Sequence, residues 1–319
     1  MKNYIFKRIL GMIWVMFIVL TLVFIIVRLA PGDPATLILG PDATPEQALE
    51  LRENMGFNRP IIIQYADFIS KVVQGDLGKS IFFNKPVLSV LAERAEPSIL
   101  LTLFSLGIGI SIALPFGIAS AYYRGTLLDQ SSLTGAMLVA AIPSFWTGLI
   151  LQQYLGTELG WFPVSGYGGP GATFGERAYH LLLPSLVLGI VNSALILRFT
   201  RASMLDVLTE DYIRTARSKG LSEINVVLRQ AFKNTLIPLA TVIGLTFALL
   251  ISGAVVTERV FNLPGIGSLV VGSVLRRDYP MIQGTLIVVS AVYVLVNFLI
   301  DMIYLWIDPR VKYLSLIHI

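Results

Sequence analysis

Hydrophobic residues along this 319-residue chain gather into six long runs, separated by segments that hold most of its charged residues. A bilayer core about 30 Å thick needs roughly 20 apolar residues to be crossed by one helix. Each run approaches or exceeds that length, so the pattern predicts an all-α membrane protein with six transmembrane helices. The predicted spans are residues 9–27, 99–122, 133–155, 181–199, 235–256 and 285–307.

Composition favours a membrane protein over a soluble one. The chain is 55% hydrophobic and 14% charged, with a mean hydropathy of +0.74, whereas globular proteins are about 45–50% apolar and about 25% charged. This balance excludes a soluble enzyme, a disordered protein and a nucleic-acid binder. The lack of cysteine excludes disulfides and thiolate metal sites. With His180 and His318 as the only histidines, we expect no histidine-based metal cluster.

The first run has an alternative interpretation as a secretory signal, because Lys2, Lys7 and Arg8 precede it. It is longer than the apolar region of a usual signal, no small-residue cleavage site follows it, and five more runs come after it. We therefore expect it to remain as the first span.

Lys and Arg residues in the short loops indicate the orientation, because they are enriched on the cytoplasmic side. Thirteen fall on the side that holds both termini and four on the other, so both termini are predicted to be cytoplasmic. The long loop at 31–96 then lies outside. A proline-rich start at 31–34 ends the first helix, Thr44 caps a short helix over 45–54, and residues 61–73 form an amphipathic stretch.

Polar residues inside the predicted spans are mostly neutral, and no acidic residue lies in the middle of a span. Carriers driven by ions or protons usually place ionisable groups there. The neutral residues have two interpretations, hydrogen bonding between helices or lining of a substrate path. The candidates for the path are Ser144, Asn192, Ser193, Thr241, Thr246 and Ser252.

Small residues recur at every fourth position of the second span, a pattern that lets helix backbones approach closely. We expect this stripe to pack against another helix; it consists of Ser105, Gly109, Ala113, Gly117 and Ala121.

The cytoplasmic loop at 200–234 has the signals of two helices. Thr209 is the predicted cap of a helix over 210–219 that begins with acidic and ends with basic residues. Gly220 suits the left-handed conformation that closes a helix, and Ser222 is the predicted cap of an amphipathic second helix. Such a pair fits a groove on a cytoplasmic partner or lies on anionic lipid. The residues alone leave both open.

Several motifs together resemble the permeases of ABC importers in the dipeptide, oligopeptide and nickel branch. The run Arg214-Thr215-Ala216-Arg217-Ser218-Lys219-Gly220, followed by Leu236-Ile237-Pro238, resembles the family's coupling loop, although its first two positions depart from the Glu-Ala consensus. Gly78-Lys79-Ser80 is not a phosphate-binding loop, because Val73 stands where the first glycine is required. Further similar stretches are Leu29-Ala30-Pro31-Gly32-Asp33-Pro34, Gly75-Asp76-Leu77-Gly78, Phe261-Asn262-Leu263-Pro264-Gly265-Ile266-Gly267, Arg276-Arg277-Asp278-Tyr279-Pro280 and Asp308-Pro309-Arg310.

The resemblance implies the type I ABC importer permease fold with a small extracytoplasmic cap after the first helix. The expected division is a cytoplasmic N-terminus and first helix at 1–30, the cap at 31–96, the permease core at 97–307 with the coupling loop at 200–234, and a cytoplasmic tail at 308–319. Residues 314–319 lie outside the family pattern and are assigned no role.

The resemblance also implies the function of a permease subunit in an ATP-driven importer of a bacterial cell membrane. Its cargo would be di- or oligopeptides, or nickel, glutathione or a related small solute, and the sequence does not select among them. Expected partners are a second homologous permease, two ABC ATPases and an extracytoplasmic solute-binding protein. No cofactor is expected on this chain, because ATP and Mg²⁺ are held by the ATPases. The residues implied to couple to the ATPase are Arg214, Thr215, Ala216, Arg217, Gly220 and Leu221.

The main alternative is an ion- or proton-coupled secondary transporter that acts without an ATPase. The lack of acidic residues in mid-span argues against it. A membrane-embedded hydrolase is less favoured still, because His180 has no evident nucleophile beside it in the sequence.

Overall fold

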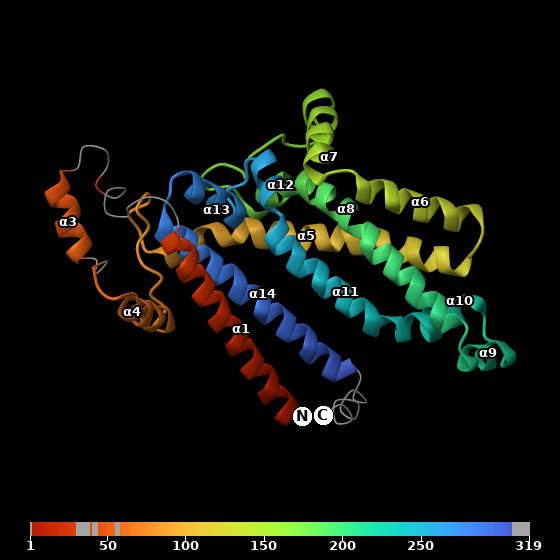
Figure 1. Ribbon diagram of the computed structural model, residues 1–319. Coiled ribbons are helices and arrows are strands. Elements are labelled where there is room, and N and C mark those ends of the chain that lie inside the picture. Colours follow the sequence, from red (N-terminus) through yellow and green to blue (C-terminus); the bar gives the residue numbers. More distant parts are fainter. Residues whose placement is uncertain (1, 30–38, 40–43, 55–57, 308–319) are drawn as a thin grey trace. The chain divides into compact units, whose positions relative to one another are not determined.

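The computed structural model describes residues 2–29, 39, 44–54 and 58–307, and this part of the chain is helical with no β-strand (Figure 1). The chain divides into two compact units, Met1–Glu96 with Ser268–Leu295 and Pro97–Gly267 with Val296–Ile319. The proline-rich segment at 31–34 and the tail at 314–319 lie outside the described residues.

The first unit contains α1 (Lys2–Leu29), α3 (Pro45–Asn54), α4 (Ile61–Val73), the start of α5 (Val87–Tyr122), most of α13 (Ile266–Leu275) and the first part of α14 (Tyr279–Ile307). The predicted bounds of α3 and α4 are confirmed. Thr44 caps α3 as predicted, because its hydroxyl accepts the N–H of Gln47 while the Gln47 side chain accepts the N–H of Thr44.

The second unit contains the rest of α5 and the helices that follow it along the chain. These are α6 (Leu127–Ala141), α7 (Ser144–Leu151), the π-helix η1 (Gln152–Glu158), α8 (Phe174–Leu208), α9 (Asp211–Ser218), α10 (Glu223–Asn225), the π-helix η2 (Val226–Ala231), α11 (Phe232–Gly253) and α12 (Val255–Val260).

Five helical segments of the described chain are long and apolar enough to cross a membrane. They match the predicted first, second, fourth, fifth and sixth spans, although α5 begins at Val87, before the predicted start at residue 99. The prediction of an uninterrupted third span at 133–155 is wrong, because α6 and the α7–η1 segment meet at a bend of 95°. Ile142 is extended and Pro143 follows it, and proline lacks the N–H that would continue the helix. The expected number of six therefore holds only if this bent pair is one span.

Helices α5 and α8 approach so closely that three glycines of the second unit have little space for a side chain. A Cβ at Gly109 would lie 3.1 Å from the carbonyl oxygen of Gly189, and one at Gly189 would lie 2.8 Å from that of Ser105. A Cβ at Gly117 would lie 2.7 Å from the Cβ of Thr200. The predicted packing role of the small stripe is therefore confirmed.

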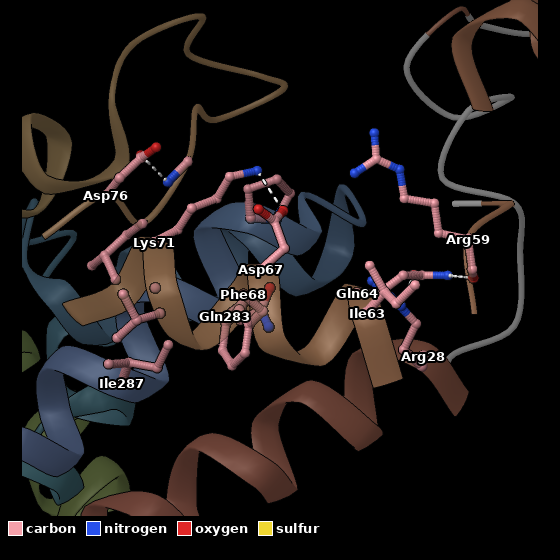
Figure 2. Close-up of a pocket in the computed structure, with 15 residues that line it drawn as sticks. Arg28, Arg59, Ile63, Gln64, Asp67, Phe68, Lys71, Asp76, Gln283 and Ile287 are labelled. Atoms are coloured by element: carbon pink, nitrogen blue, oxygen red, sulfur yellow. Dashed lines mark hydrogen bonds and ion pairs between the residues drawn. The ribbon is translucent and has the colours of Figure 1, made fainter. Parts of the chain in front are cut away.

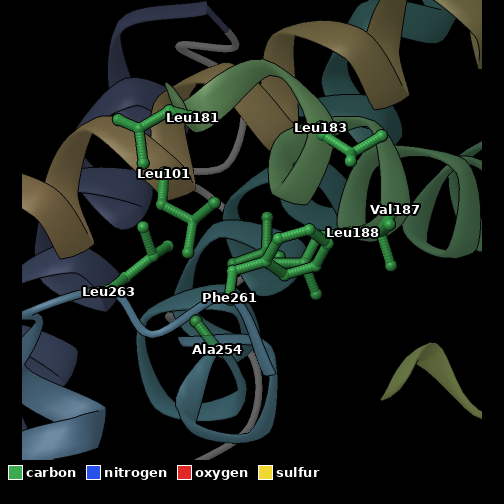
Figure 3. Close-up of a cluster of buried hydrophobic side chains, with 9 residues drawn as sticks. Leu101, Leu181, Leu183, Val187, Leu188, Ala254, Phe261 and Leu263 are labelled. Atoms are coloured by element: carbon green, nitrogen blue, oxygen red, sulfur yellow. The ribbon is translucent and has the colours of Figure 1, made fainter. Parts of the chain in front are cut away.

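One apolar cluster of the second unit lies near the start of α8 and the end of α11. Figure 3 shows Phe261 and Leu188 close together within it. Leu101 comes from α5, Leu181 from α8 and Leu250 from α11, and all three are buried there. The cluster ties the segment after α12 to the long helices.

A separate apolar cluster of the first unit lies between α1, α4 and α14. We name it the α1–α14 cluster. Its buried members are Leu20, Val23 and Ile287. Asp278 joins two other segments of this unit: its carboxylate accepts the Ser80 hydroxyl at 2.5 Å and the N–H of Met281 at 3.2 Å. It thereby caps α14 and fixes the loop around residue 80.

We predict that Gly117→Ala destabilises the protein by about 1–3 kcal/mol, because the added methyl would overlap Thr200 and also crowd the carbonyl of Leu197. The measurement is the midpoint of heat-induced loss of the monodisperse protein in detergent. Gly107→Ala is the matched control, because a Cβ there meets nothing within 4 Å. Equal midpoints for the two variants would contradict the packing described for α5 and α8.

Candidate functional site

Helix α9 is a two-turn helix between the end of α8 and the start of α10. Glu210 precedes it with extended backbone, and the Glu210 carbonyl accepts the N–H groups of Ile213 and Arg214. The prediction that Thr209 caps α9 is wrong, because its hydroxyl donates to the carbonyl of Asp206 at 2.7 Å. Thr209 therefore ends α8, because its side chain bonds backward along the chain rather than forward.

The end of α9 follows the prediction for Gly220. Its φ is +75°, and its N–H donates to the Arg217 carbonyl at 2.9 Å, while that of Leu221 reaches the Ala216 carbonyl at 3.4 Å. Since a left-handed backbone suits glycine and strains most other residues, Gly220 sets the direction in which the chain leaves the helix.

One face of α9 is buried against the rest of the second unit. Ile213 is 0% exposed and Ala216 is buried beside it. They pack with residues of α5, α8 and η2, in a set that we name the α9 cluster: Ala121, Met204, Ile213, Ala216, Val226, Val227 and Ala231. Burying an isoleucine stabilises a protein by about 1.5–3 kcal/mol, so α9 is held against these helices.

The opposite face of α9 is exposed and rich in basic residues. Arg214, Thr215, Arg217 and Leu221 are all exposed. Arg214 pairs with Asp211 at 3.2 Å, with 72% of its own side chain exposed, and such surface pairs contribute little to stability. Of the residues predicted to couple, only Ala216 points into the chain.

Two polar contacts link α9 to the helices that follow it. The Arg217 guanidinium donates to both oxygens of Glu223, at 3.0 and 3.4 Å, across the turn at Gly220. Asn234 of α11 donates to the Tyr212 hydroxyl at 2.6 Å. The predicted second helix begins after Ser222 as expected, but the Ser222 hydroxyl caps no backbone N–H and instead accepts the Asn225 side chain.

A buried ion pair joins α6 to α8 in the same unit. Both oxygens of Asp129 accept bonds from Arg201, at 2.6 and 2.8 Å, and they also accept the Ser120 hydroxyl and the Gly125 N–H. Asp129 is 3% exposed. The sequence predicted Arg201 only as a charge of the cytoplasmic loop and gave no role to Asp129, an acidic residue that lies just before the predicted span at 133–155.

Glu258 is a second buried acid that the sequence analysis overlooked. It is 1% exposed, and one of its oxygens accepts the Ser98 hydroxyl at 2.6 Å. The same hydroxyl accepts the N–H of Ile266 at 2.8 Å. A Cβ at Gly265 would lie 2.4 Å from the Glu258 carboxylate, which explains a glycine in that turn.

The residues proposed for the substrate path lie on α7, α8 and α11. Ser193 and Thr246 are buried, and their hydroxyls donate to carbonyls of their own helices at 2.7 Å. The Asn192 amide does the same at 2.8 Å. Ser144 and Thr241 are half-buried. The side chain of Ser252, in α11, lies outside the described part of the structure.

Two family models match the chain. The model for the binding-protein-dependent transport system inner membrane component matches residues 113–313. The model for the N-terminal part of the membrane component of such systems matches residues 1–103. The matched residues fall in both compact units.

Relatives of known sequence align over nearly the whole chain. A probable peptide ABC transporter permease of Sinorhizobium fredii is 41% identical over 98% of this chain and 100% of its own length. A glutathione transport system permease of Escherichia coli is 42% identical over the same shares.

A solved structure of the MetNI methionine ABC transporter in an inward-facing conformation is similar in fold. Its matching chain is 17% identical with a TM-score of 0.57, and the match covers 69% of this chain and 96% of that one. The fold expected from the sequence, that of a type I importer permease, is confirmed.

We predict that Arg201→Gln destabilises the protein by about 3 kcal/mol, because it leaves the Asp129 carboxylate buried without its cation. Thermal unfolding in detergent measures the effect, and Arg198→Gln, which removes an exposed cation of α8, is the matched control. Adding Asp129→Asn to Arg201→Gln should recover part of the loss. A double variant whose loss equals the sum of the two single losses would contradict the coupling.

Proposed function

The chain belongs to the family of binding-protein-dependent transport system inner membrane components, and from that premise we propose how its residues serve import. It is the permease subunit of an ABC importer, a multi-pass membrane protein and not an enzyme. The family implies an ATPase and a solute-binding protein as partners. The alternative of a secondary transporter has no support.

We propose that α9 is the coupling helix that docks on the ATPase. The observation that carries this proposal is its two-sided character. Ile213 and Ala216 fasten one face to α5, α8 and η2, while Arg214, Thr215 and Arg217 face outward. A helix with one face fastened and one exposed can receive a displacement from a partner and pass it to the helices beneath.

The two neighbours of α9 give that displacement a route into the membrane. Helix α8 leads from the membrane to α9, and the helical run from Glu223 through α11 leads from α9 back into the membrane. In this proposal, Ala216 holds α9 in place, Gly220 sets its exit, Arg217 is oriented by Glu223, and Arg214, Thr215 and Leu221 contact the ATPase. The contact must differ in strength between two states of the importer to shift their populations. ATP and Mg²⁺ would be bound by the ATPases.

The substrate path is proposed to run between this chain and a second homologous permease, with two ATPases in the assembly. Ser144, Asn192, Ser193, Thr241, Thr246 and Ser252 remain the proposed path residues. Because the half-buried Asn192 donates its amide N–H to a carbonyl of its own helix, it would offer a solute the free lone pairs of its amide oxygen.

The proposed topology has both termini in the cytoplasm of a bacterial cell, with residues 31–96 as an extracytoplasmic cap before a core at 97–307. It is supported by the excess of Lys and Arg in the loops on the side of the termini. It also puts α9 on the side where ATP is found.

The proposed cargo is a peptide, either a di- or oligopeptide or a peptide-like solute such as glutathione. Support comes from the names of the relatives, one a probable peptide permease and one a glutathione permease. Nickel or another small solute is the alternative within the family resemblance. Calorimetric screening of the cognate binding protein with dipeptides, glutathione and Ni²⁺ tests the choice.

We predict that Gly220→Val uncouples transport from ATP hydrolysis. A β-branched residue at φ +75° is strained by about 1–2 kcal/mol, so the chain would leave α9 in another direction. Transport into vesicles should fall at least tenfold at normal abundance, and stimulation of the ATPase by the loaded binding protein should be lost.

Two variants control this prediction. Gly220→Asn should retain transport, because asparagine tolerates the left-handed region. Gly166→Val places the same residue at another glycine of positive φ, far along the chain from α9, and should leave ATPase stimulation intact. Full uptake by Gly220→Val would overturn the role of this turn.

A further inference from the structure

A polar pocket of about 360 Å³ lies in the first unit, away from the coupling helix in sequence. It follows one face of α4 and is bounded by the end of α1, the turn at Asp76 to Gly78 and the first turns of α14. Figure 2 shows Arg28 and Arg59 near one end of α4, and Lys71 and Asp76 near the other. Nothing in the import mechanism uses this pocket.

Two guanidinium groups define the charge at one end of the pocket. The Arg28 guanidinium lies 4.5 Å from the ring centroid of Phe24 and donates to the Gln64 side chain. Gln64 in turn donates to the Arg59 carbonyl at 2.7 Å. The Arg59 guanidinium has no ion-pair partner among the described residues. Arginine binds phosphate oxygens through paired N–H groups.

The acidic residues of the pocket are already engaged. Asp67 pairs with Lys71 at 2.8 Å, and Asp76 accepts the N–H of Gly78 at 2.8 Å. Arg59 is therefore the cation of the pocket that is placed to attract an anion.

The floor of the pocket is apolar and continues into the α1–α14 cluster. Phe68, Val72, Leu77 and Ile287 line the pocket and belong to that cluster. The pocket thus combines a cationic end with an apolar wall, as an amphiphile requires. Its volume is near the lower end of ligand pockets, about 300–1,000 Å³, so it would take a headgroup rather than a whole lipid.

The position of the pocket indicates the source of the anion. The candidate span of α1 ends at Leu29, directly after Arg28, and that of α14 begins at Tyr279, next to Pro280. Figure 1 shows α4 nearly end-on where α1 and the first part of α14 run lengthwise. In α4, Ile61 and Ile62 are 65% and 72% exposed. A helix that crosses the spans at their ends with exposed isoleucines is typical of the membrane interface.

We propose that this pocket binds a phosphate group, supplied by the headgroup of a phospholipid in the leaflet at the Arg28 end of α1. In the proposed topology this is the outer leaflet. The bound lipid would fill the space between α4 and the two spans and fix the cap on the membrane.

Native mass spectrometry of the purified full-length chain in detergent tests the proposal, with phosphatidylglycerol as the probe and diacylglycerol as the matched lipid without phosphate. We expect phosphatidylglycerol to bind, diacylglycerol not to bind, and Arg59→Gln to weaken binding roughly tenfold, as expected for the loss of a charge-assisted contact. Arg59→Lys should retain part of the affinity. Lys79→Gln, which removes an exposed cation of the neighbouring loop outside the pocket, should change nothing.

Three results would overturn the proposal. Equal affinity for phosphatidylglycerol in Arg59→Gln and the unmodified chain would remove the site. Inorganic phosphate that binds as tightly as the lipid would assign the pocket to a free anion. Weaker capture of the binding protein by Arg59→Gln, with lipid binding unchanged, would make this face a protein-docking surface.

Discussion

Close contact between α5 and α8 is the constraint on which the rest of the second unit depends. Inside a bilayer, the hydrophobic effect does not drive two transmembrane helices together, so their association depends on close van der Waals packing. Gly109, Gly117 and Gly189 provide that range, since a side chain at any of them would meet the facing helix. The close packing of α5 against α8 places Ser120 of α5 and Arg201 of α8 around Asp129. The residues of the α9 cluster come together near the same ends of these two helices.

In the proposed mechanism, this arrangement lets a short helix in a loop act on long helices in a membrane. The α9 cluster contains residues of α5, α8 and η2. Arg217 and Tyr212 of α9 also contact Glu223 of α10 and Asn234 of α11. Packed interiors transmit displacement because they hold few voids. η2 adds a wide helical turn at this point, a feature often found at functional sites.

The sequence predicted local features well where one residue decides them. Helix α3 begins at a proline after a capping threonine, α4 has a clear amphipathic pattern, and Gly220 closes α9. Predictions failed where a distant or competing contact decides. Thr209 bonds backward to Asp206, the third span bends at Pro143, and Asp129 meets Arg201 from 72 residues away. No periodicity in the sequence contains that last contact.

The proposed coupling role requires that the exposed face of α9 touch the ATPase and that its buried face not touch it. The lack of cysteine in the chain permits a direct measurement, in which Thr215→Cys and, separately, Ala216→Cys are treated with a short cysteine-reactive crosslinker in the assembled importer. We expect a crosslink to the ATPase from Thr215→Cys that changes in yield with ATP, and none from Ala216→Cys. An intact assembly in which Thr215→Cys gives no ATPase crosslink, with or without ATP, would contradict the proposed coupling role.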